Sequence, residues 1–126
     1  MNVEHVALWV RDLDAMAEFY ASWFGGSAGP AYRNAASGFS SRFVSFASGS
    51  RLELMRRADR LAPDPEGRAG WAHLCFSAGG RGRVDELAAE FRSAGVTVAD
   101  GPRLTGDGYY ELVVLDPEGN RVELTA

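Results

Sequence analysis

The sequence predicts an α+β fold of two tandem βαβββ modules that form concave mixed sheets, and three observations carry this prediction. The hexapeptide Gly-Ser-Arg-Leu-Glu-Leu at 49–54 recurs seventy positions later as Gly-Asn-Arg-Val-Glu-Leu at 119–124. The two histidines, His5 and His73, are sixty-eight positions apart, and each lies in a short apolar run. Both halves show the same order of strand and helix patterns. A repeat of this kind indicates one structural unit that occurs twice.

The first half reads as a strand, a helix and three further strands. Asp12 is a suitable N-terminal cap for the helix, whose apolar residues recur near the 3.6-residue period, and Gly25 and Gly26 end it. The strand patterns are bounded by turn residues. The expected elements are a strand at about 3–10, a helix at about 13–24, and strands at about 30–34, 41–48 and 51–57.

The second half repeats this order. Val84, Leu87, Ala88 and Phe91 form the apolar face of its helix, and Gly95 closes it. The expected elements are strand 71–77, a helix at about 82–94, strands 96–99 and 109–115, a turn at 116–119 and strand 120–125. We therefore expect a single domain at 1–126, with module one at about 1–58, a linker at about 59–69 and module two at about 70–126.

The amino-acid composition of the chain limits the classes of function that it can have. The chain has 126 residues, 46% hydrophobic and 24% charged, which suits one globular domain. A net charge of −4 without a basic run gives no expectation of nucleic acid or membrane partners. Lysine is absent, which excludes Schiff-base chemistry. With one cysteine, Cys75, and neither a signal peptide nor a membrane-spanning pattern, the expected compartment is the cytoplasm.

Strand parity places four polar residues on matching faces. Side chains alternate along a strand, so His5 and His73 point away from the apolar residues next to them, and Glu53 and Glu123 do the same between their flanking aliphatics. If the helices cover the apolar faces, all four side chains project onto the open, concave side. We expect two imidazoles and two carboxylates to converge there.

Such a set suits a divalent metal ion. Imidazole and carboxylate ligands suit Ni, Zn, Co, Fe or Mn, and four of them leave positions for water or substrate. Taken singly, each residue is more simply a hydrogen-bonded or solvated strand residue. Because all four occupy matching places in a duplicated half, a shared metal site is the better interpretation.

The same residues resemble a known family. The order His5, Glu53, His73, Glu123 and the ending Leu-Asp-Pro-Glu-Gly-Asn-Arg-Val-Glu-Leu at 115–124 resemble the vicinal oxygen chelate superfamily, and within it the glyoxalase I-like proteins. The resemblance implies that the four residues bind one divalent metal ion per site. It also implies a homodimer and a small-molecule substrate, in the manner of a lactoylglutathione lyase.

The number of ligands indicates the reaction. By the resemblance, dioxygenases and thiol transferases of this superfamily have three ligands, whereas glyoxalase I and related epimerases have a fourth at the place of Glu53. We expect a lyase or isomerase that moves a proton through an enediolate of an α-oxo hemithioacetal or a related α-hydroxycarbonyl. By analogy Glu123 is the base and Glu53 its counterpart. The alternatives are a non-catalytic drug-binding protein of the bleomycin-resistance type, an epimerase, a dioxygenase or a thiol transferase.

Two tryptophans are candidate substrate contacts. Trp9 and Trp71 share faces with His5 and His73 by parity. In glutathione-using relatives the resemblance leads us to expect Arg and Asn four positions after the first and second ligands, but Trp9 and Arg57 stand there. These two departures count against glutathione as the thiol, and the sequence leaves the identity of the thiol open.

Overall fold

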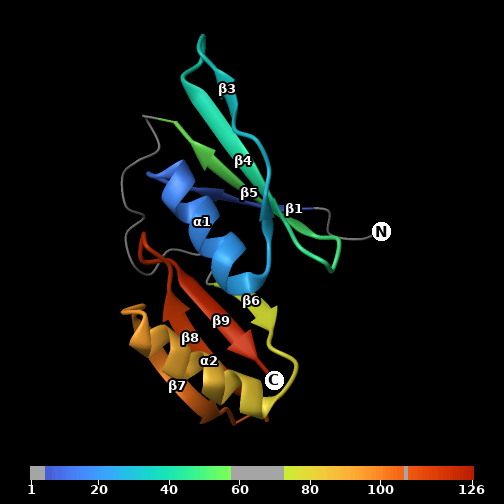
Figure 1. Ribbon diagram of the computed structural model, residues 1–126, viewed down its shortest axis with the longest axis vertical. Coiled ribbons are helices and arrows are strands. Elements are labelled where there is room, and N and C mark those ends of the chain that lie inside the picture. The colour runs from blue at the N-terminus through green and yellow to red at the C-terminus, as the bar shows by residue number, and fades with distance from the viewer. Residues whose placement is uncertain (1–4, 58–72, 107) are drawn as a thin grey trace. The chain divides into compact units, whose positions relative to one another are not determined.

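The computed structural model describes residues 5–57, 73–106 and 108–126. The chain divides into two compact units, Met1–Arg68 and Ala69–Ala126. In the described parts, each unit combines one helix with one mixed sheet (Figure 1), and the predicted α+β class is confirmed. The elements of the first unit are β1 (His5–Trp9), α1 (Leu13–Phe24), β2 (Ser27–Ala28), β3 (Tyr32–Asn34), β4 (Phe39–Ser45) and β5 (Arg51–Arg56). Those of the second are β6 (Leu74–Ser77), α2 (Arg81–Ser93), β7 (Val98–Leu104), β8 (Tyr110–Leu115) and β9 (Arg121–Thr125).

In the first unit, the strands follow the order β1-β5-β4-β2, and β3 also pairs with β4. β1 runs parallel to β5, whereas β4 is antiparallel to its neighbours. α1 lies across one face of this sheet (Figure 1) and contacts β4 and β5. Met16 and Tyr20 of α1, together with Val44 and Leu54 of the sheet, are at most 1% exposed. Burial of these apolar side chains holds the helix on the sheet.

The sequence explains where α1 begins and ends. The Asp12 carboxylate accepts hydrogen bonds from the backbone N–H groups of Asp14 (3.1 Å) and Ala15 (3.0 Å), which satisfies two donors of the first turn. Gly25, with φ at +65°, ends the helix in the left-handed region. The predicted bounds of 13–24 are confirmed. Along the helix, the Phe19 ring packs edge-on against Tyr20.

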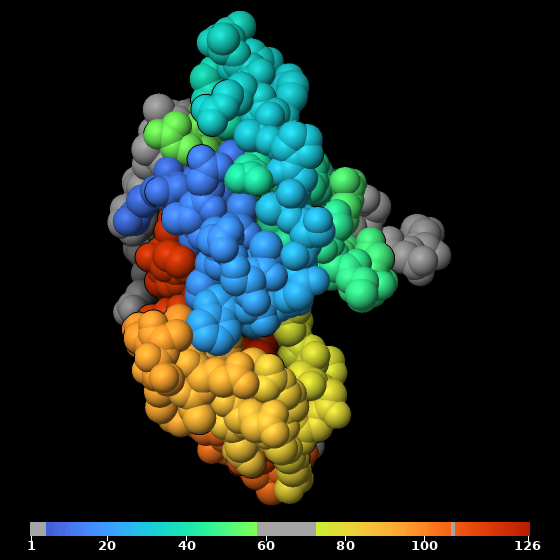
Figure 2. All heavy atoms as spheres, in the orientation of Figure 1, coloured from blue at the N-terminus to red at the C-terminus, as the bar shows by residue number. Residues whose placement is uncertain are grey.

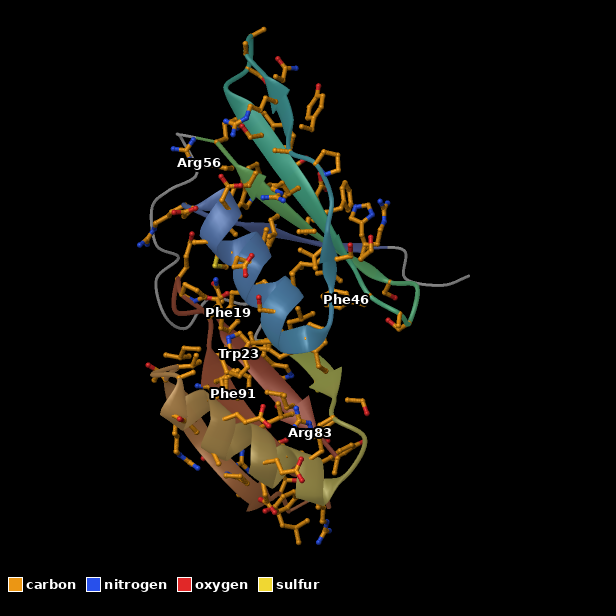
Figure 3. All side chains as sticks on the ribbon, viewed as in Figure 1. Phe19, Trp23, Phe46, Arg56, Arg83 and Phe91 are labelled. Atoms are coloured by element: carbon orange, nitrogen blue, oxygen red, sulfur yellow. The ribbon has the colours of Figure 1, made fainter. Side chains whose placement is uncertain are left out.

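In the second unit, the order is β6-β9-β8-β7, with β6 parallel to β9. Atoms of α2 form much of the visible surface of this unit (Figure 2). Val84 and Phe91 of α2, and Val114 and Val122 beneath them, are fully buried. Arg83 lies on the outer surface of the helix and pairs with Glu86 and Glu90 (Figure 3). The apolar face predicted for this helix is thus confirmed.

The strand predicted at 41–48 is shifted to Phe39–Ser45, and two further strands differ more from prediction. The strand expected at 96–99 runs instead from Val98 to Leu104, because the chain passes through Gly101 and Pro102 with a shift of register between Asp100 and Arg103. Glycine and proline normally end a strand pattern, so the sequence predicts a shorter strand than the one observed. The two-residue strand β2 was not predicted, because it is too short to show alternation.

In each unit, the glutamate of the predicted site lies on the face of the sheet opposite the helix. In β1, β5 and β4 the register aligns Ala7 with Glu53 and Glu53 with Phe43. In β6, β9 and β8 it aligns Cys75 with Glu123 and Glu123 with Val113. Aligned residues on paired strands project to the same side. We call this side, in each unit, the open face.

Candidate functional site

The first unit brings His5 and Glu53 together on its open face. His5 begins β1, and Glu53 lies in the middle of β5, its parallel neighbour. The His5 Nε2 atom is 3.7 Å from Glu53 Oε2. The imidazole side chain is 41% exposed and the carboxylate 17%. Parity alone predicted this shared face. The register aligns Ala7, two residues after His5, with Glu53, so the contact between His5 and Glu53 runs diagonally between the two strands.

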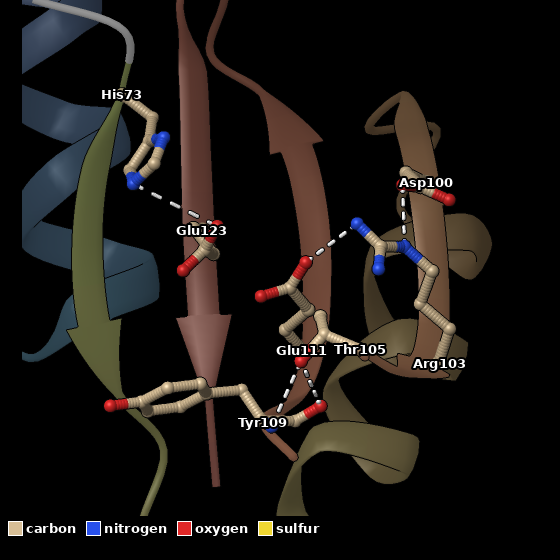
Figure 4. Close-up of polar contacts among 7 residues, drawn as sticks. All are labelled: His73, Asp100, Arg103, Thr105, Tyr109, Glu111 and Glu123. Atoms are coloured by element: carbon tan, nitrogen blue, oxygen red, sulfur yellow. Dashed lines mark hydrogen bonds and ion pairs between the residues drawn. The ribbon is translucent and has the colours of Figure 1, made fainter. Parts of the chain in front are cut away.

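The second unit repeats the arrangement. His73 immediately precedes β6, and Glu123 lies in β9 beside it (Figure 4). The distance from His73 Nε2 to Glu123 Oε2 is 3.8 Å, and the side chains are 42% and 18% exposed. The two His–Glu pairs therefore match in sequence position, distance and exposure. The internal repeat extends to the geometry of its polar residues.

Each pair has the donor chemistry of two ligands of one metal ion, at a spacing slightly longer than bound ligands have. Donors about 2.1 Å from an ion would lie about 3.0–3.4 Å apart at angles between about 90° and 109°. The observed 3.7 and 3.8 Å need only small side-chain rotations to reach that range. Over residues 5–57, 73–106 and 108–126, no group of three or more His, Cys, Asp or Glu side chains is gathered as a metal site. Each unit thus provides two of the four predicted ligands, and their union around one ion stays a prediction.

Two aromatic side chains, Phe43 and Trp9, share the open face with the first pair. The Phe43 ring lies edge-on to His5, with 5.5 Å between ring centroids. The Arg51 guanidinium carbon stands 4.0 Å from the Phe43 ring centroid. Trp9, the predicted substrate contact, is 39% exposed on the same open face. Trp71, the other predicted contact, lies outside the described residues.

A thiol and further charges surround the second pair. Cys75 is exposed and aligned with Glu123 in the parallel β6–β9 register. Partial desolvation, and then the hydrogen bond to Glu123 and the negative charges of Glu123 and Glu111, raise the pKa of the Cys75 thiol to about 11. A thiol with so high a pKa is a poor nucleophile near neutral pH.

Sequence reasoning missed a row of charged residues on this face. Arg103 of β7 donates from Nε to Asp100 at 2.7 Å, and its Nη2 atom lies 2.7 Å from Glu111 Oε1 (Figure 4). The hydrogen bond from Arg103 holds the pKa of the Asp100 carboxyl below its ordinary value. Glu111 is only 8% exposed, although it lies within the strand β8, whose other residues are apolar or aromatic. That isolated charge in an apolar run was the signal available in the sequence.

The chain belongs to the Glyoxalase/Bleomycin resistance protein/Dioxygenase superfamily, whose sequence profile matches residues 2–124. This match confirms the predicted resemblance at the level of the family. The chain is therefore a protein of the glyoxalase-like fold. A comparison with curated protein sequences finds no match.

Solved structures agree with this class. A lactoylglutathione lyase from Agrobacterium tumefaciens is 28% identical, with 98% of this chain and 92% of that chain covered and a TM-score of 0.71. A trypanothione-dependent glyoxalase I from Leishmania major is 21% identical, with 99% and 86% covered and a TM-score of 0.78. A glyoxalase family protein from Enterococcus faecalis is 20% identical, with 99% and 97% covered and a TM-score of 0.82. Among the described residues, no helix is long and apolar enough to cross a membrane.

Proposed function

We propose that the chain is a metal-dependent lyase or isomerase of the glyoxalase I type. It moves a proton between adjacent carbons of a small α-oxo hemithioacetal or a related α-hydroxycarbonyl compound. The observation that carries this proposal is the pair of matching His–Glu contacts at 3.7 and 3.8 Å, one on the open face of each unit. Membership of the superfamily supports it.

The proposed site binds one divalent ion, which is Ni, Zn, Co, Fe or Mn. Its ligands are His5, Glu53, His73 and Glu123. All four are partly exposed, so they are accessible to an ion and to substrate oxygens. When bound, the ion would draw electron density from two adjacent substrate oxygens and make the neighbouring C–H bond more acidic. Imidazole and carboxylate donors fit each of these ions.

The proton transfer falls to the two glutamates. One oxygen of Glu123 accepts the proton from one of the two adjacent substrate carbons and returns it to the other carbon. Substrate and product are therefore isomers. Glu53 holds the matching place on the other half-site. A carboxylate positioned in this way contributes about 10²–10⁴-fold to such a step. The histidines bind and orient without taking the proton.

The proposed thiol is not glutathione. Arg57 and Trp9 stand where the resemblance leads us to expect an Asn and an Arg, and they contact each other, with 5.9 Å from the Arg57 guanidinium carbon to the Trp9 ring centroid. Trp9 is then a substrate contact rather than a core residue, as its exposure allows. We further propose a homodimer that acts in the cytoplasm.

Metal binding is tested first. The full chain is stripped with a chelator and titrated separately with Ni²⁺, Zn²⁺, Co²⁺ and Mn²⁺, and with Fe²⁺ under anaerobic conditions. We expect one ion to bind for each set of His5, Glu53, His73 and Glu123. The His5→Ala and His73→Ala variants should bind the ion at least tenfold more weakly. Glu18→Gln, a change on the exposed surface of α1, is the matched control for Glu53→Gln and Glu123→Gln.

Turnover is tested second, with methylglyoxal adducts of several thiols and the loaded protein. We expect loss of the adduct, and a rate at least 10²-fold lower in Glu123→Gln, with Glu18→Gln unchanged. Full metal occupancy with no turnover of any adduct would overturn the proposed reaction. Failure to bind metal would favour a binding protein of the bleomycin-resistance type.

A further inference from the structure

An exposed row of aromatic side chains continues along the open face of the first unit. Trp9 of β1, Tyr32 of β3, and Phe39 and Phe43 of β4 make up this row, which we call the aromatic strip. Trp9 is 39% exposed and Tyr32 57%, so both rings are accessible to a ligand. The proposed reaction uses none of these rings except Trp9.

Trp9, Tyr32 and Phe39 contact one another through the Phe39 ring. Trp9 lies edge-on to Phe39, with 6.3 Å between centroids and an interplanar angle of 86°. Tyr32 lies 6.3 Å from the same Phe39 ring at 55°. Ser41, which is aligned with Tyr32 and Met55 in the register, is only 4% exposed beneath this cover. The strip is therefore a packed surface rather than a set of isolated rings.

The strip is continuous with the His5–Glu53 pair. Phe43 is aligned with Glu53 across β4 and β5 and lies edge-on to His5 at 5.5 Å. Trp9 stands two residues beyond Ala7, which is aligned with Glu53, so it lies about 7 Å further along the strand. A molecule held at His5 and Glu53 can thus extend over the rings.

Guanidinium groups border both ends of the strip. Arg51 lies over Phe43, with 4.0 Å from its guanidinium carbon to the ring centroid, and Arg57 lies near Trp9 at 5.9 Å. Arg51 shares the side of β5 that carries Glu53, and Arg57, one residue past the end of β5, reaches the Trp9 ring on the same open face. On the described part of this open face, two guanidiniums therefore accompany one carboxylate. The charge suits an anionic ligand.

We propose that the aromatic strip binds the part of the substrate remote from the metal, and that this part is an aromatic ring with an anionic substituent. The inference rests on the proposed function, because it treats His5 and Glu53 as the reacting end of the site. Edge and stacked contacts with Trp9, Tyr32 and Phe39 hold the ring. Arg57 pairs with the anionic group.

Three thioethers serve as probes, because they bind without reacting. 4-(Methylthio)benzoate is aromatic and anionic, 4-(methylthio)benzamide is aromatic and neutral, and 3-(methylthio)propanoate is anionic without a ring. Their Kd values for the full chain are measured by ligand-observed NMR with a chelator present. We expect the benzoate to bind about tenfold more tightly than the propanoate and about threefold more tightly than the benzamide.

Matched variants assign the effect to residues. Trp9→Leu should weaken the benzoate about tenfold, and Trp9→Phe about threefold or less. Arg57→Gln should abolish the preference for benzoate over benzamide. Arg33→Gln removes the same charge from β3 on the side opposite Tyr32 and should change nothing. Circular dichroism verifies that each variant is folded.

Three outcomes overturn the inference: no binding of any probe, equal Kd values for benzoate and propanoate, or unchanged binding in both Trp9 variants. The proposed function fails differently. Metal-dependent turnover without an aromatic preference would remove only the inference. An aromatic preference in a protein that takes up no metal would remove only the proposed reaction.

Discussion

Arg103 and Glu111 form an ion pair of 2.7 Å on the open face of the second unit, and the Glu111 side chain is only 10% exposed. A carboxylate that is mostly removed from water needs such a partner, because an unpaired buried charge is strongly unfavourable. The pair therefore supports the face on which Glu123 lies.

Replacing Arg103 should accordingly destabilise the chain more than replacing a surface arginine. We expect Arg103→Met to lower the urea midpoint clearly, and Arg103→Lys to recover part of the loss. Arg83→Met is the control, since Arg83 pairs with Glu86 and Glu90 on the outside of α2 and such surface pairs contribute little. Equal midpoints for the two Met variants would contradict this role.

The Asp100–Arg103 contact predicts a pH dependence. The pKa of Asp100 is lower in the folded chain than in the unfolded one, because Arg103 hydrogen-bonds its charged form. The contribution to stability is thus present above about pH 4, the ordinary carboxyl range, and is lost as the pH falls through the folded value. Wild type should exceed Asp100→Asn in free energy of unfolding at pH 7, and the difference should shrink below pH 4. A difference that grows on acidification would refute the assignment.

Gly101 shows why a glycine is needed beside Glu111. Its φ is +81°, and an added Cβ would lie 2.5 Å from the Glu111 carbonyl oxygen. Gly119 has a similar φ of +85° but open space around it. Gly119→Ala should cost about 1–2 kcal/mol for its backbone conformation alone, and Gly101→Ala distinctly more. Chemical denaturation of both variants measures the difference, and equal losses would show that the close approach is unimportant.

The cap of α1 gives a further prediction. Asp12→Ala removes the acceptor for the Asp14 and Ala15 N–H groups and should lower the free energy of unfolding by about 1 kcal/mol. Asp12→Asn keeps a side-chain oxygen and should retain most of the stability. A loss in Asn as large as in Ala would mean that the negative charge, rather than the hydrogen bonds, stabilises the helix.

The sequence predicted much of this architecture for identifiable reasons. Helix α1 was predicted at its observed bounds because Asp12 and Gly25 mark both ends chemically. The two His–Glu faces followed from strand parity, which does not depend on distant contacts. β7 was misplaced because pairing with β8 carries the strand through Gly101 and Pro102, a tertiary effect that local pattern does not contain.

The surroundings of the site were harder to predict. Neither the Arg103–Glu111 pair nor the contact between Trp9 and Phe39 follows from spacing along the chain, since each joins strands whose register is set by the whole sheet. Parity placed Trp9 on the open face, but it did not give the extent of its exposure, because an aromatic residue in a strand is usually buried. The alternation of residues along each strand predicts which side chains share a face of the sheet. The pairing of the strands determines which of these side chains contact each other.

Anomalous X-ray diffraction from crystals loaded with Zn²⁺ or Mn²⁺ tests the central claim most directly. We predict a single peak at each site, about 2.0–2.2 Å from a nitrogen of His5 and of His73 and from an oxygen of Glu53 and of Glu123. A loaded crystal with no peak at either His–Glu pair, or with an ion held by one pair alone, would contradict the account.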